Sequence, residues 1–153
     1  MIAETLLGHG DRAFEYYQQI NPAAKNDIID IFECEPYSYP QNILGNEHPQ
    51  FGLGRNSWLS GTASWTYQAA TKHILGILPT YAGLKINPCI PKDWNEFSVS
   101  RHFRGSTYEI SVKNPSVVNG GMKSLVVDGE PVAGDTIPLS DDKKNHIVEV
   151  ILG

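Results

Sequence analysis

The sequence contains 153 residues, with a formal net charge of −5 and a hydrophobic content of 41%. This length can bury a hydrophobic core, and the apolar content is typical of folded protein rather than of disorder. The acidic balance, without a cluster of lysine and arginine, excludes nucleic acid as an expected partner. No apolar run approaches the roughly 20 residues of a membrane span, so we expect no membrane segment.

The first half of the chain has helical periodicity. Gly8 and Gly10 interrupt the first apolar stripe, and Asp11 is placed to cap a second helix that stops before Pro22. The predicted helical segments are residues 2–7, 11–20, 27–32 and 61–75. A proline- and glycine-rich loop over residues 34–56 lies between the last two, and so long a loop is usually functional. Three or so helices cannot close a helical core, and the first lacks an N-cap, so we expect Met1 to lie inside something larger.

The second half of the chain has the period-two alternation of β-strands. Asp128 and Gly129 form the dipeptide most typical of a hairpin turn, between the apolar residues of two short strands. The predicted strands are residues 84–86, 97–103, 107–113, 125–127, 131–132 and 146–152. The order of elements therefore predicts helices followed by a β region.

Only two cysteines, Cys34 and Cys89, are present, and they lack metal or redox spacing. They are typical of a reducing compartment, and the residues after Met1 lack the basic start of a signal peptide, so we expect a cytoplasmic protein. The five histidines show no metal-ligand spacing, so no metal site is predicted. The sequence also contains no P-loop and no dinucleotide fingerprint, and no cofactor is expected.

The segment Ser60-Gly61-Thr62 directly precedes the predicted helix at residues 61–75. A helix that starts there presents free N–H groups, hydroxyls and the positive end of its dipole, a combination suited to phosphate. Gly61 would let the anion approach the backbone. The alternative is an ordinary helix capped by Ser60 or Thr62, with its neighbouring tryptophans, Trp58 and Trp65, in a core.

Residues 33–39 contain two carboxylates and two tyrosines. In an extended segment Glu35, Tyr37 and Tyr39 would face one side, which suits a sugar subsite. The alternative is a solvated loop whose tyrosines pack on the helices. We reject Glu33 and Glu35 as a glycosidase acid/base pair, because such carboxylates flank the scissile bond from opposite sides.

With these motifs in hand, the sequence resembles the C-terminal end of the family 94 glycoside phosphorylases, the cellobiose phosphorylase and chitobiose phosphorylase group. The resemblance covers nearly the whole chain and is carried by the stretches at residues 6–17, 34–39, 56–65, 87–94 and 101–108. It implies an α+β chain. Residues 1–78 would be the last helices of an (α/α)6 barrel, and residues 79–153 a C-terminal antiparallel β-sandwich lobe.

The resemblance also implies a reaction: inverting phosphorolysis of a β-linked disaccharide to an α-sugar 1-phosphate and a free sugar. By motif match Thr62 and Gly61 would bind phosphate, and Glu35 and Tyr39 would contact the acceptor sugar, with Tyr37 beside them. Cellobiose is the expected disaccharide, phosphate the only co-substrate, and a homodimer the expected state of the parent enzyme.

The catalytic aspartic acid and a phosphate-binding histidine of this family lie upstream of the matching region. The chain alone is therefore expected to be inactive. Two other functions remain open. A non-catalytic carbohydrate-binding or interaction module would fold and bind sugar through its β half, whereas a hydrolase using Glu33 or Glu35 would release sugar without phosphate.

Overall fold

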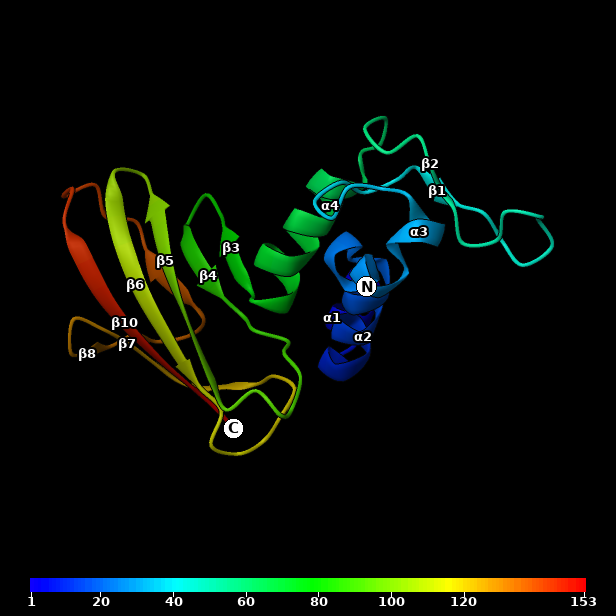
Figure 1. The fold of residues 1–153 in the computed structure, drawn as a ribbon. Helices are drawn as coiled ribbons and strands as arrows, with labels where there is room; N and C mark the ends of the chain where they lie inside the picture. The colour runs from blue at the N-terminus through cyan, green and yellow to red at the C-terminus, as the bar shows by residue number, and fades with distance from the viewer. The chain divides into compact units, whose positions relative to one another are not determined.

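The computed structural model describes residues 1–153 throughout, in two compact units. One unit combines Met1–Phe14 with Thr71–Gly153, and the other consists of Glu15–Ala70. Both helices and sheets are present, so the predicted α+β class is confirmed (Figure 1). The assignment of residues 1–78 to a barrel and 79–153 to a lobe stays a prediction, and the compact units divide the chain at other residues.

The first half is helical, as predicted. It contains α1 (Ile2–Leu6), α2 (Gly10–Ile20), a 3-10 helix (Pro22–Ile28), α3 (Ile29–Phe32) and α4 (Thr62–Gln68). The predicted helix at 61–75 changes character midway, since Ala69–Ile74 winds as a π-helix. Within the loop at 34–56, β1 (Asn42–Ile43) and β2 (Gly54–Arg55) pair as a small antiparallel ribbon that the sequence analysis did not predict.

The predicted capping role of Asp11 is wrong. The helix α2 already begins at Gly10, and the Asp11 Oδ1 atom accepts the backbone N–H of Lys92 at 2.9 Å. That bond lowers the pKa of the Asp11 carboxyl. A Cβ at Gly10 would lie 2.1 Å from the carbonyl oxygen of Ile90, so only glycine permits this close approach.

Five strands form the larger sheet, in the spatial order β5-β6-β10-β7-β8. Their bounds are β5 Glu96–Phe103, β6 Ser106–Lys113, β7 Met122–Val127, β8 Glu130–Pro131 and β10 Asn145–Leu152. The pairs are antiparallel except β6 with β10, which is parallel and departs from the predicted antiparallel arrangement. The long connection over residues 114–144 makes this possible, because parallel neighbours need a crossover rather than a tight turn.

A second sheet has three antiparallel strands in the order β3-β4-β9: β3 (Ile77–Pro79), β4 (Gly83–Ile86) and β9 (Thr136–Pro138). In the unit that contains both sheets, alternate residues of the strands form the buried core. On β6 these are Tyr108, Ile110 and Val112, and on β10 they are Val148, Val150 and Leu152, all buried. The parallel register sets the two rows beside each other on one face.

Candidate sugar and phosphate site

Residues 35–38 form a tight turn, closed by the Ser38 N–H donating to the Glu35 carbonyl oxygen at 2.9 Å. Pro36 occupies the second position of this turn, where its fixed φ is favourable. The predicted extended segment is therefore wrong. Tyr37 is left 72% exposed at the tip, whereas Tyr39 turns into a half-buried position, so the three predicted sugar residues do not share one side.

Glu35 is held by the segment that follows the loop. Its Oε1 atom accepts the indole N–H of Trp58 at 3.0 Å. The Trp58 indole, and to a smaller degree the Ser57 hydroxyl, lower the pKa of the Glu35 carboxyl. An ionised carboxylate accepts hydrogen bonds but has no proton to donate. Glu35 is thus suited to receiving sugar hydroxyls and unsuited to acting as a general acid, which requires a raised pKa.

Trp58 and Tyr37 form an exposed aromatic pair beside this carboxylate. Their ring centroids lie 5.9 Å apart at an interplanar angle of 58°, and the two residues are 67% and 72% exposed. Trp65 is also exposed, at 63%, so the alternative in which the tryptophans pack into a core is wrong for this structure. The sequence analysis missed the link between Trp58 and Glu35, since 23 residues separate them and no periodicity joins them.

Tyr39 lies in different surroundings from Glu35 and Tyr37. Burial raises the pKa of its phenol, which neighbours Tyr17 and is hydrogen-bonded to Thr66. Its backbone carbonyl accepts the Ser60 hydroxyl at 2.9 Å. The structure therefore joins Glu35 and Tyr37 to Trp58, and separates Tyr39 from them.

The start of α4 has free donors. Gly61 is the N-cap residue, Thr62 is the first helical residue, and no side chain caps the helix. The Trp65 N–H makes the first helical bond, to the Gly61 carbonyl at 3.1 Å, which leaves the N–H groups of residues 62–64 ahead of it. The alternative in which Ser60 or Thr62 caps the helix is wrong. The Ser60 hydroxyl donates to the Tyr39 carbonyl, and Thr62 already lies within the helix.

The fold itself does not require glycine at position 61. A Cβ there would make ordinary contact with the Trp65 ring at 3.6 Å, and the backbone has φ −81°. At Gly54 of the same unit, by contrast, a Cβ would lie 2.4 Å from the Cys34 sulfur. Packing therefore explains the glycine at 54 and does not explain the one at 61.

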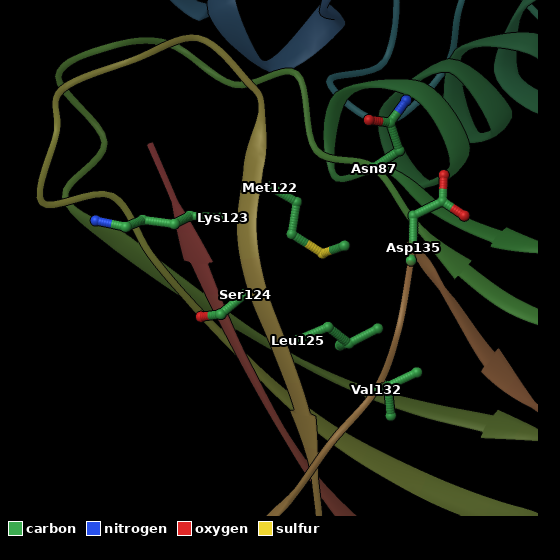
Figure 2. A pocket seen from close by; sticks show the side chains of 8 residues that line it. Asn87, Met122, Lys123, Ser124, Leu125, Val132 and Asp135 are labelled. Carbon is green, nitrogen blue, oxygen red and sulfur yellow. The ribbon is translucent and has the colours of Figure 1, made fainter.

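The unit of Met1–Phe14 and Thr71–Gly153, which we call the β unit, contains a separate open cavity of about 500 Å³. Figure 2 shows Met122 and Leu125 extending from β7 toward the segment that carries Val132 and Asp135, while Lys123 extends away. Asp135 at its edge is paired with Lys85, with 3.0 Å between the Oδ2 and Nζ atoms. No aromatic side chain lines this cavity, so it lacks the surface that stacks against sugar rings.

Two general features of the molecule bear on the site. No helix combines the length and the apolar character that crossing a bilayer would need. No group of three or more histidine, cysteine, aspartate or glutamate side chains is arranged to hold a metal ion.

Comparison with known proteins gives two family matches. Residues 1–76 match the family described as the glycosyl hydrolase 94 superfamily, catalytic domain, and residues 81–132 match glycosyl hydrolase family 65, C-terminal domain. The chain is 45% identical over 152 residues to N,N'-diacetylchitobiose phosphorylase of Vibrio proteolyticus, covering 99% of this chain and 19% of that protein. It is 37% identical over 150 residues to solabiose phosphorylase of Paenibacillus borealis, covering 98% and 20%. The chain thus spans about a fifth of the length of these relatives.

Proposed function

The chain belongs to the glycosyl hydrolase 94 superfamily, and from this premise we propose that it is the C-terminal part of an inverting disaccharide phosphorylase. In this reaction a phosphate oxygen bonds to the anomeric carbon as the glycosidic C–O bond breaks. The leaving oxygen takes a proton from a general acid. The products are an α-sugar 1-phosphate and a free sugar, and similarity to relatives named as phosphorylases supports this reaction.

Phosphate changes what the protein must supply. An inverting hydrolase needs one carboxylic acid for the leaving oxygen and one carboxylate to activate water. Phosphate is already anionic and nucleophilic, so a phosphorylase needs only the acid and a site that holds phosphate in line with the bond. An anion site is therefore the feature that distinguishes the two reactions.

The observation that carries the proposal is the uncapped start of α4. Free N–H groups, the Thr62 hydroxyl and the helix dipole converge there, and Gly61 leaves the backbone open although the fold would accept a side chain. We assign Gly61 and Thr62 to phosphate. Because α4 is short, the dipole alone would be a weak contribution, and the Thr62 hydroxyl is the specific ligand.

The sugar-binding assignment rests on the loop before α4. Glu35 offers an ionised acceptor, and Tyr37 offers an exposed ring to the apolar side of a sugar. We keep Tyr39 as a sugar-binding residue, although its half-buried position allows only part of its surface to reach a ligand.

We propose that the general acid lies outside this chain. The chain corresponds to about a fifth of its relatives' length, and Glu35 is held ionised. An aspartic acid and a histidine upstream would complete the site, so the chain alone would be inactive. We further propose a cytoplasmic homodimer that needs no cofactor beyond phosphate.

The substrate is proposed to be a β-linked disaccharide. The sequence analysis favoured cellobiose, but the 45% identity to proteins named N,N'-diacetylchitobiose phosphorylase puts that disaccharide first. A non-catalytic sugar-binding module stays the alternative, because the β unit also has an open cavity of about 560 Å³ that is lined by Trp94 and Phe97.

The assignment of Thr62 is tested by Thr62→Val in the complete protein, with Thr107→Val in β6 as the matched control. A lost hydrogen bond to a charged group costs about 1.5–3 kcal/mol. The KM for phosphate should therefore rise at least about tenfold, while the KM for the disaccharide stays within about twofold. Equal losses for phosphate and disaccharide would contradict the assignment.

A further inference from the structure

Residues 35–39, which we call the sugar loop, and residues 57–60, the segment entering α4, are joined by three side-chain hydrogen bonds. The Ser38 hydroxyl donates to the Ser57 carbonyl at 2.7 Å, and the Ser60 hydroxyl donates to the Tyr39 carbonyl at 2.9 Å. The third bond runs from the Trp58 indole to Glu35. All six residues belong to the compact unit Glu15–Ala70, so these bonds fix one segment against the other within a single body.

Trp58 differs from the two serines in the kind of group that accepts its hydrogen bond. The serines bond to backbone carbonyls, which any sequence would present, whereas Trp58 bonds to a carboxylate that can itself bind a ligand. The indole N–H can only donate, so it favours the ionised form of its partner. The Trp58 N–H bonds to the Oε1 atom of Glu35. A carboxylate has several lone-pair sites across its two oxygens, so Glu35 can still accept a hydrogen bond from a ligand.

The exposure of Trp58 argues against a packing role. A tryptophan usually buries most of its ring, yet this one is 67% exposed and lies against the equally exposed Tyr37. The ring is thus available on the same surface as the carboxylate it holds. Position 58 also lies only four residues before Thr62, so one short segment reaches both the sugar loop and the phosphate-binding helix start.

We propose that Trp58 is a positioning residue for the sugar released in the reaction: its indole N–H fixes the Glu35 carboxylate, beside the Tyr37 ring, to accept a sugar hydroxyl. This inference rests on the proposed phosphorylase function. Fixing Glu35 before the sugar arrives removes the entropy cost of ordering a flexible side chain on binding. Trp58 thereby acts on the sugar through Glu35.

The test is a double-mutant cycle in the complete protein with Trp58→Phe, Glu35→Gln and both together. Phenylalanine keeps an aromatic ring but removes the N–H, and glutamine keeps the size of Glu35 but removes its charge. In the synthetic direction, each single variant should raise the KM for the acceptor sugar about tenfold, with the KM for the sugar 1-phosphate within about twofold. The double variant should be no worse than Glu35→Gln, because Trp58 would act only through Glu35.

Additive losses in the cycle would overturn the inference, and so would an acceptor KM unchanged by Trp58→Phe. If the unaltered protein shows no phosphorolysis, the proposed function fails, and the role in sugar binding fails with it. Normal phosphorolysis with an additive cycle overturns the inference alone.

A second readout does not need activity. In the 153-residue chain, NMR titration of the Glu35 carboxyl should show that Trp58→Phe raises its pKa, because the donor that stabilises the charged form is lost. Trp65→Phe is the matched control, since Trp65 is similarly exposed at 63%. It should leave the pKa of Glu35 unchanged. An identical pKa in Trp58→Phe and the unaltered chain would overturn the claim that Trp58 holds Glu35.

Discussion

At the scale of single residues, two glycines in the compact unit Glu15–Ala70 have different physical causes. A Cβ at Gly54 would lie 2.4 Å from the Cys34 sulfur and 3.2 Å from the Phe32 carbonyl oxygen, so packing excludes a side chain. At Gly61 a Cβ would make only ordinary contacts. One glycine is therefore structural, and the other is a candidate for ligand binding.

This contrast predicts opposite behaviour for two identical substitutions. Gly54→Ala should destabilise the chain by about 1–3 kcal/mol, because the added methyl group would overpack against the buried Cys34 sulfur. Gly61→Ala should cost about 1 kcal/mol or less in stability. In the complete protein Gly61→Ala should nevertheless raise the KM for phosphate at least about tenfold, because the methyl group would occupy the approach of the anion.

Urea unfolding of the chain and phosphate saturation of the complete protein check the two effects separately. A normal KM for phosphate in Gly61→Ala would remove the main support for the anion site. Equal destabilisation by both substitutions would show that position 61 is constrained by packing as well.

The residues of the site were predictable from sequence only where the signal is local. The helix start at Gly61 and Thr62 is a run of adjacent residues, so its geometry followed from the sequence. The contact between Trp58 and Glu35 spans 23 residues and depends on the turn at Pro36, which the sequence analysis took to be extended. Pro36, with Ser38 two positions after it, was the signal that could have revealed this turn.

At the scale of elements, His146 at the start of β10 joins two connecting segments of the β unit. Its Nδ1 atom lies 2.7 Å from Asp128 Oδ2, in the turn between β7 and β8, and its Nε2 atom lies 3.1 Å from Asp142 Oδ1. Tyr108 stacks on its ring, and Asp142 also accepts the Ser106 hydroxyl and has Lys144 nearby at 3.9 Å. Both ring nitrogens can donate only when the imidazole is protonated.

This arrangement predicts the pH dependence of stability. The carboxylates raise the pKa of His146 above 6.5, so its stabilisation is complete below about pH 6.5 and is lost as pH rises through the folded value. The Asp128 pKa is lowered, and that of Asp142 falls to about 2, so their contribution is present above about pH 3.8 and is lost in stronger acid. The network should stabilise most between these limits.

Urea unfolding midpoints between pH 6 and pH 9 provide the measurement. The unaltered chain should lose stability over this range, and His146→Gln should lose less. His102→Gln, at an exposed position of β5, should keep the original slope. The same slope in His146→Gln as in the unaltered chain would show that the contacts of His146 with Asp128 and Asp142 contribute nothing to this pH dependence.

Most long elements could be predicted from the periodicity of the sequence, whereas the short ones could not. The alternation over β5, β6 and β10 predicted those strands almost to the residue. In contrast, β9 has three residues with one buried side chain, Ile137, which is too short for any period to be visible. The parallel pairing of β6 with β10 is a property of the connection between them, which local sequence does not encode.

At the scale of the whole molecule, the chain corresponds to about a fifth of its relatives and carries an unusual amount of exposed aromatic surface. Tyr37, Phe51, Trp58, Trp65 and Tyr67 are each more than half exposed in the compact unit Glu15–Ala70. Tyr37 and Trp58 adjoin each other, and contiguous apolar surface is typical of a ligand site or an interface.

The most direct measurement is the phosphate dependence of disaccharide cleavage by the complete protein that contains this chain. With N,N'-diacetylchitobiose and cellobiose as substrates, phosphorus NMR would follow the products with and without added phosphate. We predict no cleavage without phosphate and, with phosphate, one equivalent of α-sugar 1-phosphate for each free sugar released. Release of both sugars in phosphate-free buffer would contradict the proposed phosphorolysis, because water rather than phosphate would then be the nucleophile.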